Sequence, residues 1–137
     1  MEVVDTNVII RYLMADIEEL YLQAEKIFTE AIKGQRKLFI PQSVIAEVIF
    51  VLSKVYKIPR KEIVSAIKFF LGIKSCKVQD NKIVEAALNI YEKTNLSFVD
   101  SFICAYAKLN KLKLITFDVK LKNKCKKITL HNSDASS

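Results

Sequence analysis

The sequence predicts an α/β fold, a three-layer sandwich in which a mostly parallel central sheet is flanked by helices. Short apolar runs rich in β-branched residues alternate along the chain with longer segments of helical periodicity. Strands that are separated by helices favour parallel pairing, because a parallel pair needs a long crossover connection. The length of 137 residues and the hydrophobic content of 51% suit one domain with a sizeable core.

We expect five strands. The first covers residues 1–4 and should be buried, since Val3 and Val4 are β-branched and lead toward the apolar run 8–10. Pro41 and Pro59 mark the starts of two later helices. The other predicted strands are 38–40, 76–78, 112–117 and 127–130, and helical patterns cover 17–31, 44–55, 60–71, 81–91 and 96–107, with a short helix after residue 118.

An acid follows the first strand directly. Asp5 lies where the strand ends and a helix begins, and Thr6 or Asn7 is placed to hydrogen-bond the free N–H groups that open this helix. Ligands bind at the carboxyl ends of strands in open parallel sheets, so Asp5 is a candidate site residue. The alternative is that Asp5 serves only as a helix cap.

Glu47 is expected inside an apolar stripe. It is three residues from Val44 and four from Val51, so it shares their face of the helix. An unpaired carboxylate buried there would be costly, and this cost favours a functional role. The alternative is a side chain that reaches to the edge of the stripe.

Asp100 is a third acid on an inward face, next to Ile103, Cys104 and Ala107 of the same predicted helix. The alternative is a capping box, in which the Asp100 carboxylate reaches back to the N–H of Ser97. The two interpretations are compatible, because an acid in the first turn also points toward the end of the sheet.

Asp118 ends the predicted strand 112–117 and thereby repeats the arrangement of Asp5. We expect Asp5, Glu47, Asp100 and Asp118 to converge at one edge of the sheet. Carboxylates held close together repel one another unless a cation lies among them. The set therefore predicts a hard divalent ion with oxygen ligands, Mg²⁺ or Mn²⁺.

The charge balance points to an anionic partner. The chain has 22 Lys and Arg against 15 Asp and Glu, a net charge of +7. Lysines crowd the stretch 108–127, in which Asp118 is the only acid, and Lys120, Lys122 and Lys124 are candidate RNA-binding residues. The alternative is a solvated lysine-rich surface. With two glycines in the chain, a Gly-rich phosphate loop and a dinucleotide fingerprint are excluded.

Three widely spaced cysteines suggest neither a disulfide framework nor a CxxC metal site. Together with the lack of a signal sequence or a long apolar span, they predict a cytoplasmic protein with no membrane association. We expect a single domain over residues 1–131 and a disordered tail over 132–137. His131, the only histidine, borders that tail and is interpreted as incidental.

The acids and their surroundings resemble the PIN-domain family of ribonucleases, in particular its small single-domain, VapC-like toxin members. The matching segments are Val4 to Asn7, Pro41 to Glu47, Phe98 to Asp100 and Thr116 to Asp118. The resemblance implies that Asp5, Glu47 and Asp100 are the core metal ligands, with Asp118 a fourth and more variable acid. It also implies that Asn7 and Thr116 support this group by hydrogen bonding.

The activity that this resemblance implies is Mg²⁺- or Mn²⁺-dependent endoribonucleolytic hydrolysis, leaving 5′-phosphate and 3′-hydroxyl ends. We expect RNA as the substrate and an antitoxin protein as a partner. We also expect the protein to form a homodimer. One alternative is a module of the same fold that binds RNA or protein without cleavage. Another is a haloacid-dehalogenase-like phosphatase with Asp5 as nucleophile, but its motif needs a second acid where this chain has Asn7.

Overall fold

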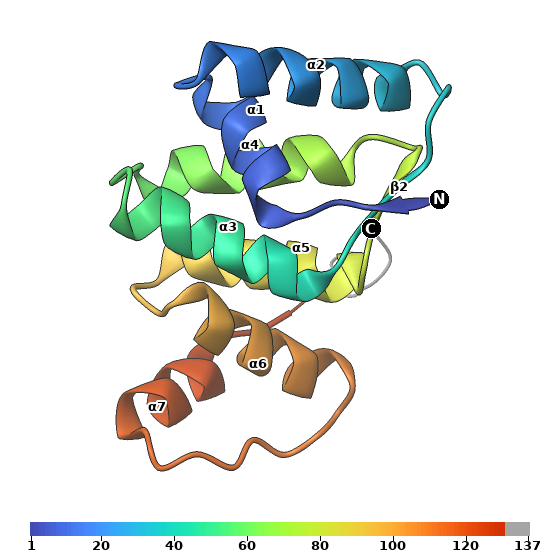
Figure 1. Cartoon of the computed structure of the whole chain (residues 1–137). Coiled ribbons are helices and arrows are strands. Elements are labelled where there is room, and N and C mark those ends of the chain that lie inside the picture. Colours follow the sequence, from blue (N-terminus) through green and yellow to red (C-terminus); the bar gives the residue numbers. More distant parts are fainter. Residues whose placement is uncertain (131–137) are drawn as a thin grey trace. The chain divides into compact units, whose positions relative to one another are not determined.

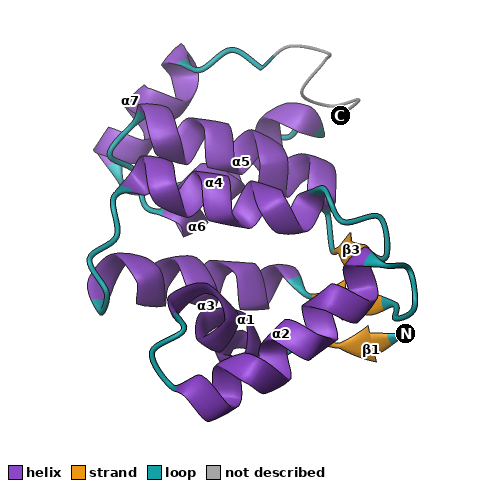
Figure 2. Ribbon diagram, turned by 90° about the horizontal axis from the view of Figure 1, so that it is seen from above, coloured by secondary structure: helices purple, strands orange, loops and turns teal. Residues whose placement is uncertain are grey.

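A three-stranded parallel sheet organises the first part of the chain (Figure 2). The computed structural model describes residues 1–130. They fall into two compact parts, unit 1 (Met1–Gln79) and unit 2, which begins at Asp80. The sheet lies in unit 1, in the order β1-β2-β3, with both pairs parallel. Its strands are β1 (Glu2–Val3), β2 (Leu38–Ile40) and β3 (Cys76–Val78).

Two helical crossovers connect these strands, as parallel pairing requires. The first contains α1 (Thr6–Met14) and α2 (Glu18–Ile32), and the second contains α3 (Gln42–Lys54) and α4 (Arg60–Leu71) (Figure 1). Pro41 and Pro59 directly precede α3 and α4, as the sequence predicts. The predicted α/β class, with helices flanking a parallel sheet, is therefore confirmed.

An aromatic cluster packs the helices of unit 1 together. Phe28 of α2 and Phe70 of α4 are fully buried, and their ring centroids lie 5.1 Å apart. Tyr12 of α1 lies against Phe28 at 4.7 Å between centroids. Burial of large aromatic side chains is a strong stabilising contribution, so this cluster fixes α1, and with it Asp5, relative to the rest of unit 1.

The first strand is shorter and more exposed than predicted. Val4 is buried, but Val3 is 71% exposed because β1 is an edge strand and successive side chains alternate between its faces. Arg36 helps to hold this edge, since its guanidinium donates to the Glu2 carboxylate at 2.7 Å. That bond lowers the pKa of Glu2.

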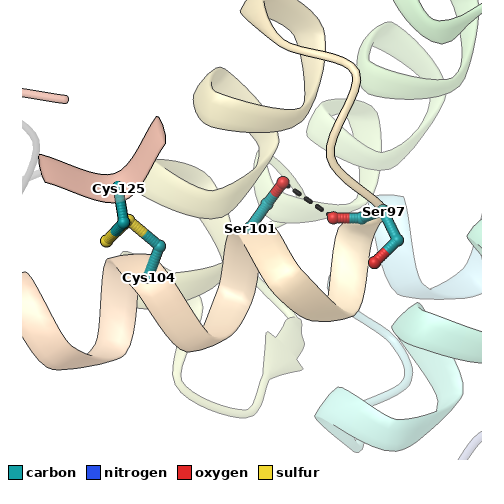
Figure 3. The surroundings of a disulfide bond; sticks show 4 residues. All are labelled: Ser97, Ser101, Cys104 and Cys125. Atoms are coloured by element: carbon teal, nitrogen blue, oxygen red, sulfur yellow. Dashed lines mark hydrogen bonds between the residues drawn. A yellow bond between two sulfur atoms is a disulfide. The ribbon is translucent and has the colours of Figure 1, made fainter. Parts of the chain in front are cut away.

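Unit 2 contains α5 (Asn81–Lys93), α6 (Phe98–Leu109) and α7 (Val119–Lys127). A disulfide between Cys104 and Cys125, with their Cα atoms 5.8 Å apart, ties α6 to α7 (Figure 3). The expectation of no disulfide is therefore wrong. The third cysteine, Cys76, is a buried free thiol in β3.

The predictions of strands at 112–117 and 127–130 are also wrong within the described residues. Residues 112–117 and 128–130 are irregular, and α7 extends to Lys127. Ile115 and Phe117 are almost fully exposed, so the apolar alternation has no packing surface here. The predicted tail 132–137 and His131 lie outside the described residues, and the single-domain prediction remains untested.

Candidate functional site

Asp5 lies at the carboxyl end of β1 and caps α1. Its backbone is extended, and its Oδ1 accepts a hydrogen bond of 2.7 Å from the N–H of Thr6. The cap is thus Asp5 itself and neither Thr6 nor Asn7. Asp5 is exposed, and within residues 1–130 no hydrogen bond or ion pair engages its Oδ2. One carboxylate oxygen therefore serves the helix and the other is available to a ligand.

Glu47 is exposed, contrary to the prediction that it belongs to a buried stripe. The residues of α3 that are buried follow helical spacing but lie on a face rotated from the predicted one: Ile45, Val48, Ile49 and Leu52. Val44 and Val51, which share the face of Glu47, are only half-buried. The interpretation as a side chain at the edge of the stripe is the one that the geometry supports.

Asp5 and Glu47 both lie toward the carboxyl ends of the parallel strands of unit 1. β1 and β2 are adjacent and parallel, and the N–H of Val4 donates to the carbonyl of Phe39 at 2.9 Å. The helices that follow these strands, α1 and α3, therefore begin at the same end of the sheet, where the strands have their carboxyl ends. Glu47 is five residues beyond Gln42, which corresponds to about 8 Å along the helix axis.

Asp100 lies in the first turn of α6 and is half-buried. Ser97 is the cap, since its Oγ accepts a bond of 3.1 Å from the N–H of Asp100. The reciprocal half of a capping box, from the N–H of Ser97 to the Asp100 carboxylate, is absent among residues 1–130. The Asp100 carboxylate is therefore not used in capping.

Asp118 ends no strand but caps α7. Its Oδ1 accepts a bond of 3.1 Å from the N–H of Leu121. Its own N–H donates to the Oγ1 of Thr116 at 3.0 Å, so Thr116 orients the residue that the resemblance expects it to support. Asn7, the other expected supporting residue, is exposed in the first turn of α1.

Comparison with known proteins decides the family. Residues 3–127 match the PIN domain.

The chain belongs to the PIN domain family.

The match includes all four acids and covers both units. The chain is also 29% identical over 108 residues to the VapC ribonuclease of Aquifex aeolicus (strain VF5), an alignment that covers 79% of each chain. No solved structure matches the chain significantly. No helix within residues 1–130 is long and apolar enough to cross a membrane.

The carboxylates of this PIN domain chain have the donor chemistry of a hard divalent ion. Within residues 1–130, the side chains of Glu47 and Asp100 have no hydrogen-bond or ion-pair partner, and Asp5 and Asp118 each commit one oxygen to a cap. No three His, Cys, Asp or Glu side chains of the described chain form a metal-holding group. The convergence of all four acids stays a prediction.

The lysines proposed for RNA binding do not share one face of α7. Lys120 and Lys124 are four residues apart and lie on one side, whereas Lys122 lies on the other side of the buried pair Leu121 and Cys125. Lys124 hydrogen-bonds Asn95. The lysine-rich segment of this PIN domain therefore presents two differently oriented basic faces.

Sequence reasoning missed the Cys104–Cys125 disulfide because it treated an odd number of distant cysteines as unpaired. A usable signal was present in the helical spacing. Cys104 shares the buried face of α6 with Ser101, and Cys125 is four residues after the buried Leu121. Two cysteines on the inward faces of successive helices are candidates for pairing.

Proposed function

We propose that this PIN domain protein is a divalent-metal-dependent endoribonuclease and the toxin of a toxin–antitoxin pair. The observation that carries the proposal is the family match over residues 3–127, which contains every acid that the sequence singles out. The similarity to a protein named VapC ribonuclease supports RNA as the substrate. The uncommitted carboxylate oxygens support a metal-dependent reaction.

In this proposal Asp5, Glu47 and Asp100 hold Mg²⁺ or Mn²⁺, and Asp118 is a fourth ligand. When bound, the ion supplies Lewis-acid stabilisation of the phosphate charge. Asp5 and Asp118 are oriented by the backbone N–H groups that they cap, and Thr116 fixes the backbone at Asp118. A carboxylate of the group accepts the proton of the attacking water.

The lysines of the last third, among them Lys120, Lys122 and Lys124, offset the repulsion between the acids and the RNA phosphates. We further propose that the protein acts in the cytoplasm, forms a homodimer and binds an antitoxin. The Cys104–Cys125 disulfide counts against a reducing cytoplasm, where disulfides are uncommon except in the intracellular proteins of hyperthermophiles.

The test is an RNA digest. The protein is mixed with end-labelled single-stranded RNA and Mg²⁺, and with the same RNA in excess EDTA. We expect shortened products only with Mg²⁺, and a loss of at least about 100-fold in rate for Asp5→Asn. Cleavage that persists in EDTA would contradict metal dependence, and RNA that is bound but never shortened would favour the non-catalytic module.

A partner test uses the reading frame next to the gene. If that frame encodes an antitoxin, co-expression should give a complex whose mass by light scattering contains both chains and whose RNA cleavage is suppressed. The isolated protein should have the mass of a dimer. A monomer with full activity would contradict the proposed homodimer without affecting the nuclease.

A further inference from the structure

Unit 2 contains a basic cavity, here called the lysine pocket, that is lined by none of the four acids. Its volume is about 320 Å³, and it is formed by the end of α6, the irregular segment 112–114 and α7. This volume is at the lower end of the range of about 300–1,000 Å³ that is typical of small-molecule sites. The pocket is therefore large enough for a group of roughly nucleotide size.

Four of the residues that line the lysine pocket are lysines, here called its rim, and they come from three chain segments. Lys108 comes from α6, Lys113 from the irregular segment, and Lys122 and Lys126 from one face of α7. Within residues 1–130 none of the four forms a salt bridge with a carboxylate. Four uncompensated positive charges around one cavity favour an anionic occupant.

The other residues that line the lysine pocket, here called its floor, are apolar: Ala107, Leu112, Leu114 and Cys125. Ala107 and Cys125 are buried, whereas Leu112 is 58% exposed. Cys125 is joined to Cys104, so α6 and α7, which carry three of the four rim lysines, are covalently connected (Figure 3). A site whose walls are fixed in advance loses less conformational entropy when it binds a ligand.

We propose that the lysine pocket binds one nucleotide of the single-stranded RNA substrate, with its phosphate at the lysines and its ribose and base against the apolar floor. The proposal rests on the proposed ribonuclease function. A charged rim above an apolar floor suits a nucleotide better than a simple anion, because a nucleotide presents both chemistries. Single-strand sites combine basic side chains with surfaces for the bases in the same way.

The position of the pocket gives it a positioning role. Lys122 and Lys126 follow Asp118 by about one and two turns of α7, or about 6 and 12 Å along its axis. Lys108 is eight residues beyond Asp100, about 12 Å along α6. The lysine pocket is therefore displaced along both helices from the two acids of unit 2, which suits a nucleotide that neighbours the cleaved bond.

The test compares two charge-matched double variants. Lys113→Gln with Lys126→Gln removes two rim charges, whereas Lys111→Gln with Lys127→Gln removes two exposed charges of the same stretch that do not line the pocket. Binding of a fluorescent 12-nucleotide RNA is measured by anisotropy in EDTA. The rim variant should bind on the order of tenfold more weakly, and its salt slope should fall by about 0.7 for each phosphate contact that is lost.

The control pair should change affinity by at most about twofold, because Lys111 and Lys127 do not line the pocket and add only to the general long-range attraction of the RNA. Equal losses in the two pairs would overturn the proposal and leave only general electrostatic attraction. All four positions are exposed, and equal melting temperatures of the variants will show that the fold is intact.

One further measurement separates the possible occupants, and the binding assay in EDTA separates the two proposals. Polyglutamate of the same charge as the RNA should compete poorly, and equal competition would overturn recognition of a nucleotide. Binding in EDTA does not depend on cleavage. A protein that fails to cut RNA but binds it through the lysine pocket refutes only the ribonuclease, whereas a nuclease whose rim variant binds like the parent refutes only the pocket.

Discussion

Asp5 and Asp118 each accept a backbone N–H at the start of a helix through Oδ1. A carboxylate has two oxygens, so capping and ligand binding are not exclusive. A negative charge at a helix N-terminus is also stabilised by the helix dipole, by about 0.3–1 kcal/mol. This stabilisation explains how the fold tolerates exposed acids at these positions before any cation is bound.

Asp100 allows the sharpest test among the acids, because Ser97 performs the capping. Asp100→Asn keeps the shape and removes the charge. We expect the metal-free variant to melt about 2–4 °C higher, since relief of repulsion among the acids outweighs the lost interaction with the helix dipole. Added Mg²⁺ should stabilise it less than the parent, and RNA cleavage should be lost. Melting curves with EDTA and with Mg²⁺, beside one RNA digest, measure all three effects.

The matched control is Ser97→Ala. It removes the observed cap bond, so it should destabilise the protein by about 1 kcal/mol while cleavage and the Mg²⁺ response survive. If Asp100→Asn instead behaves like Ser97→Ala, with lower stability and retained cleavage, Asp100 is a structural residue and does not belong to the site.

The cysteines give a direct count. In denaturant without reductant, Ellman's reagent should detect one thiol, and after reduction it should detect three. In the native protein at pH 8 the free thiol should react very slowly, because Cys76 is buried and burial raises its pKa to about 11. Three thiols before reduction would contradict the Cys104–Cys125 bond.

At the scale of elements, the sequence predicts what local periodicity and capping decide. The helix after Pro41 and the strand 38–40 are found where expected. The rotation of α3 that exposes Glu47 is not predictable in the same way, because Val44, Ile45, Val48 and Val51 are all apolar and neighbouring elements select which of them are buried. The strand prediction for 112–117 is wrong for a related reason. The pattern of this segment suits a strand, but a strand also needs a neighbouring strand to pair with, and the regular elements of unit 2 within the described residues are all helices.

The disulfide between α6 and α7 should contribute strongly to stability. It closes a loop with a sequence separation of 21, and the chain-entropy model gives about 3 kcal/mol for a loop of this size. Cys104→Ala with Cys125→Ala should therefore lower the melting temperature by about 10 °C. The parent should lose a similar amount after complete reduction, whereas reductant should not affect the double variant. An unchanged melting temperature in both cases would contradict a structural role.

At the scale of the whole molecule, the sequence predicts four site acids, and two of them, Asp5 and Asp100, have the predicted setting at the start of a helix. Asp5 and Glu47 belong to unit 1, and Asp100 and Asp118 belong to unit 2. Local patterns correctly place Asp5 where a strand ends and a helix begins, but the strand expected before Asp118 is not formed. The assembly of distant elements into one site depends on packing over the full chain, which periodicity and spacing do not encode.

The single domain predicted over residues 1–131 has a thermodynamic consequence. The part of unit 2 that the structure describes is three helices, and chains of this size bury too small a fraction of their surface to be more than marginally stable alone. We therefore expect unit 2 to unfold together with unit 1. Scanning calorimetry of the oxidised protein should show one transition whose calorimetric and van't Hoff enthalpies agree, at about 95 kcal/mol near 60 °C. Two resolved transitions, or a van't Hoff enthalpy near half the calorimetric one, would instead make each unit an independent folding domain.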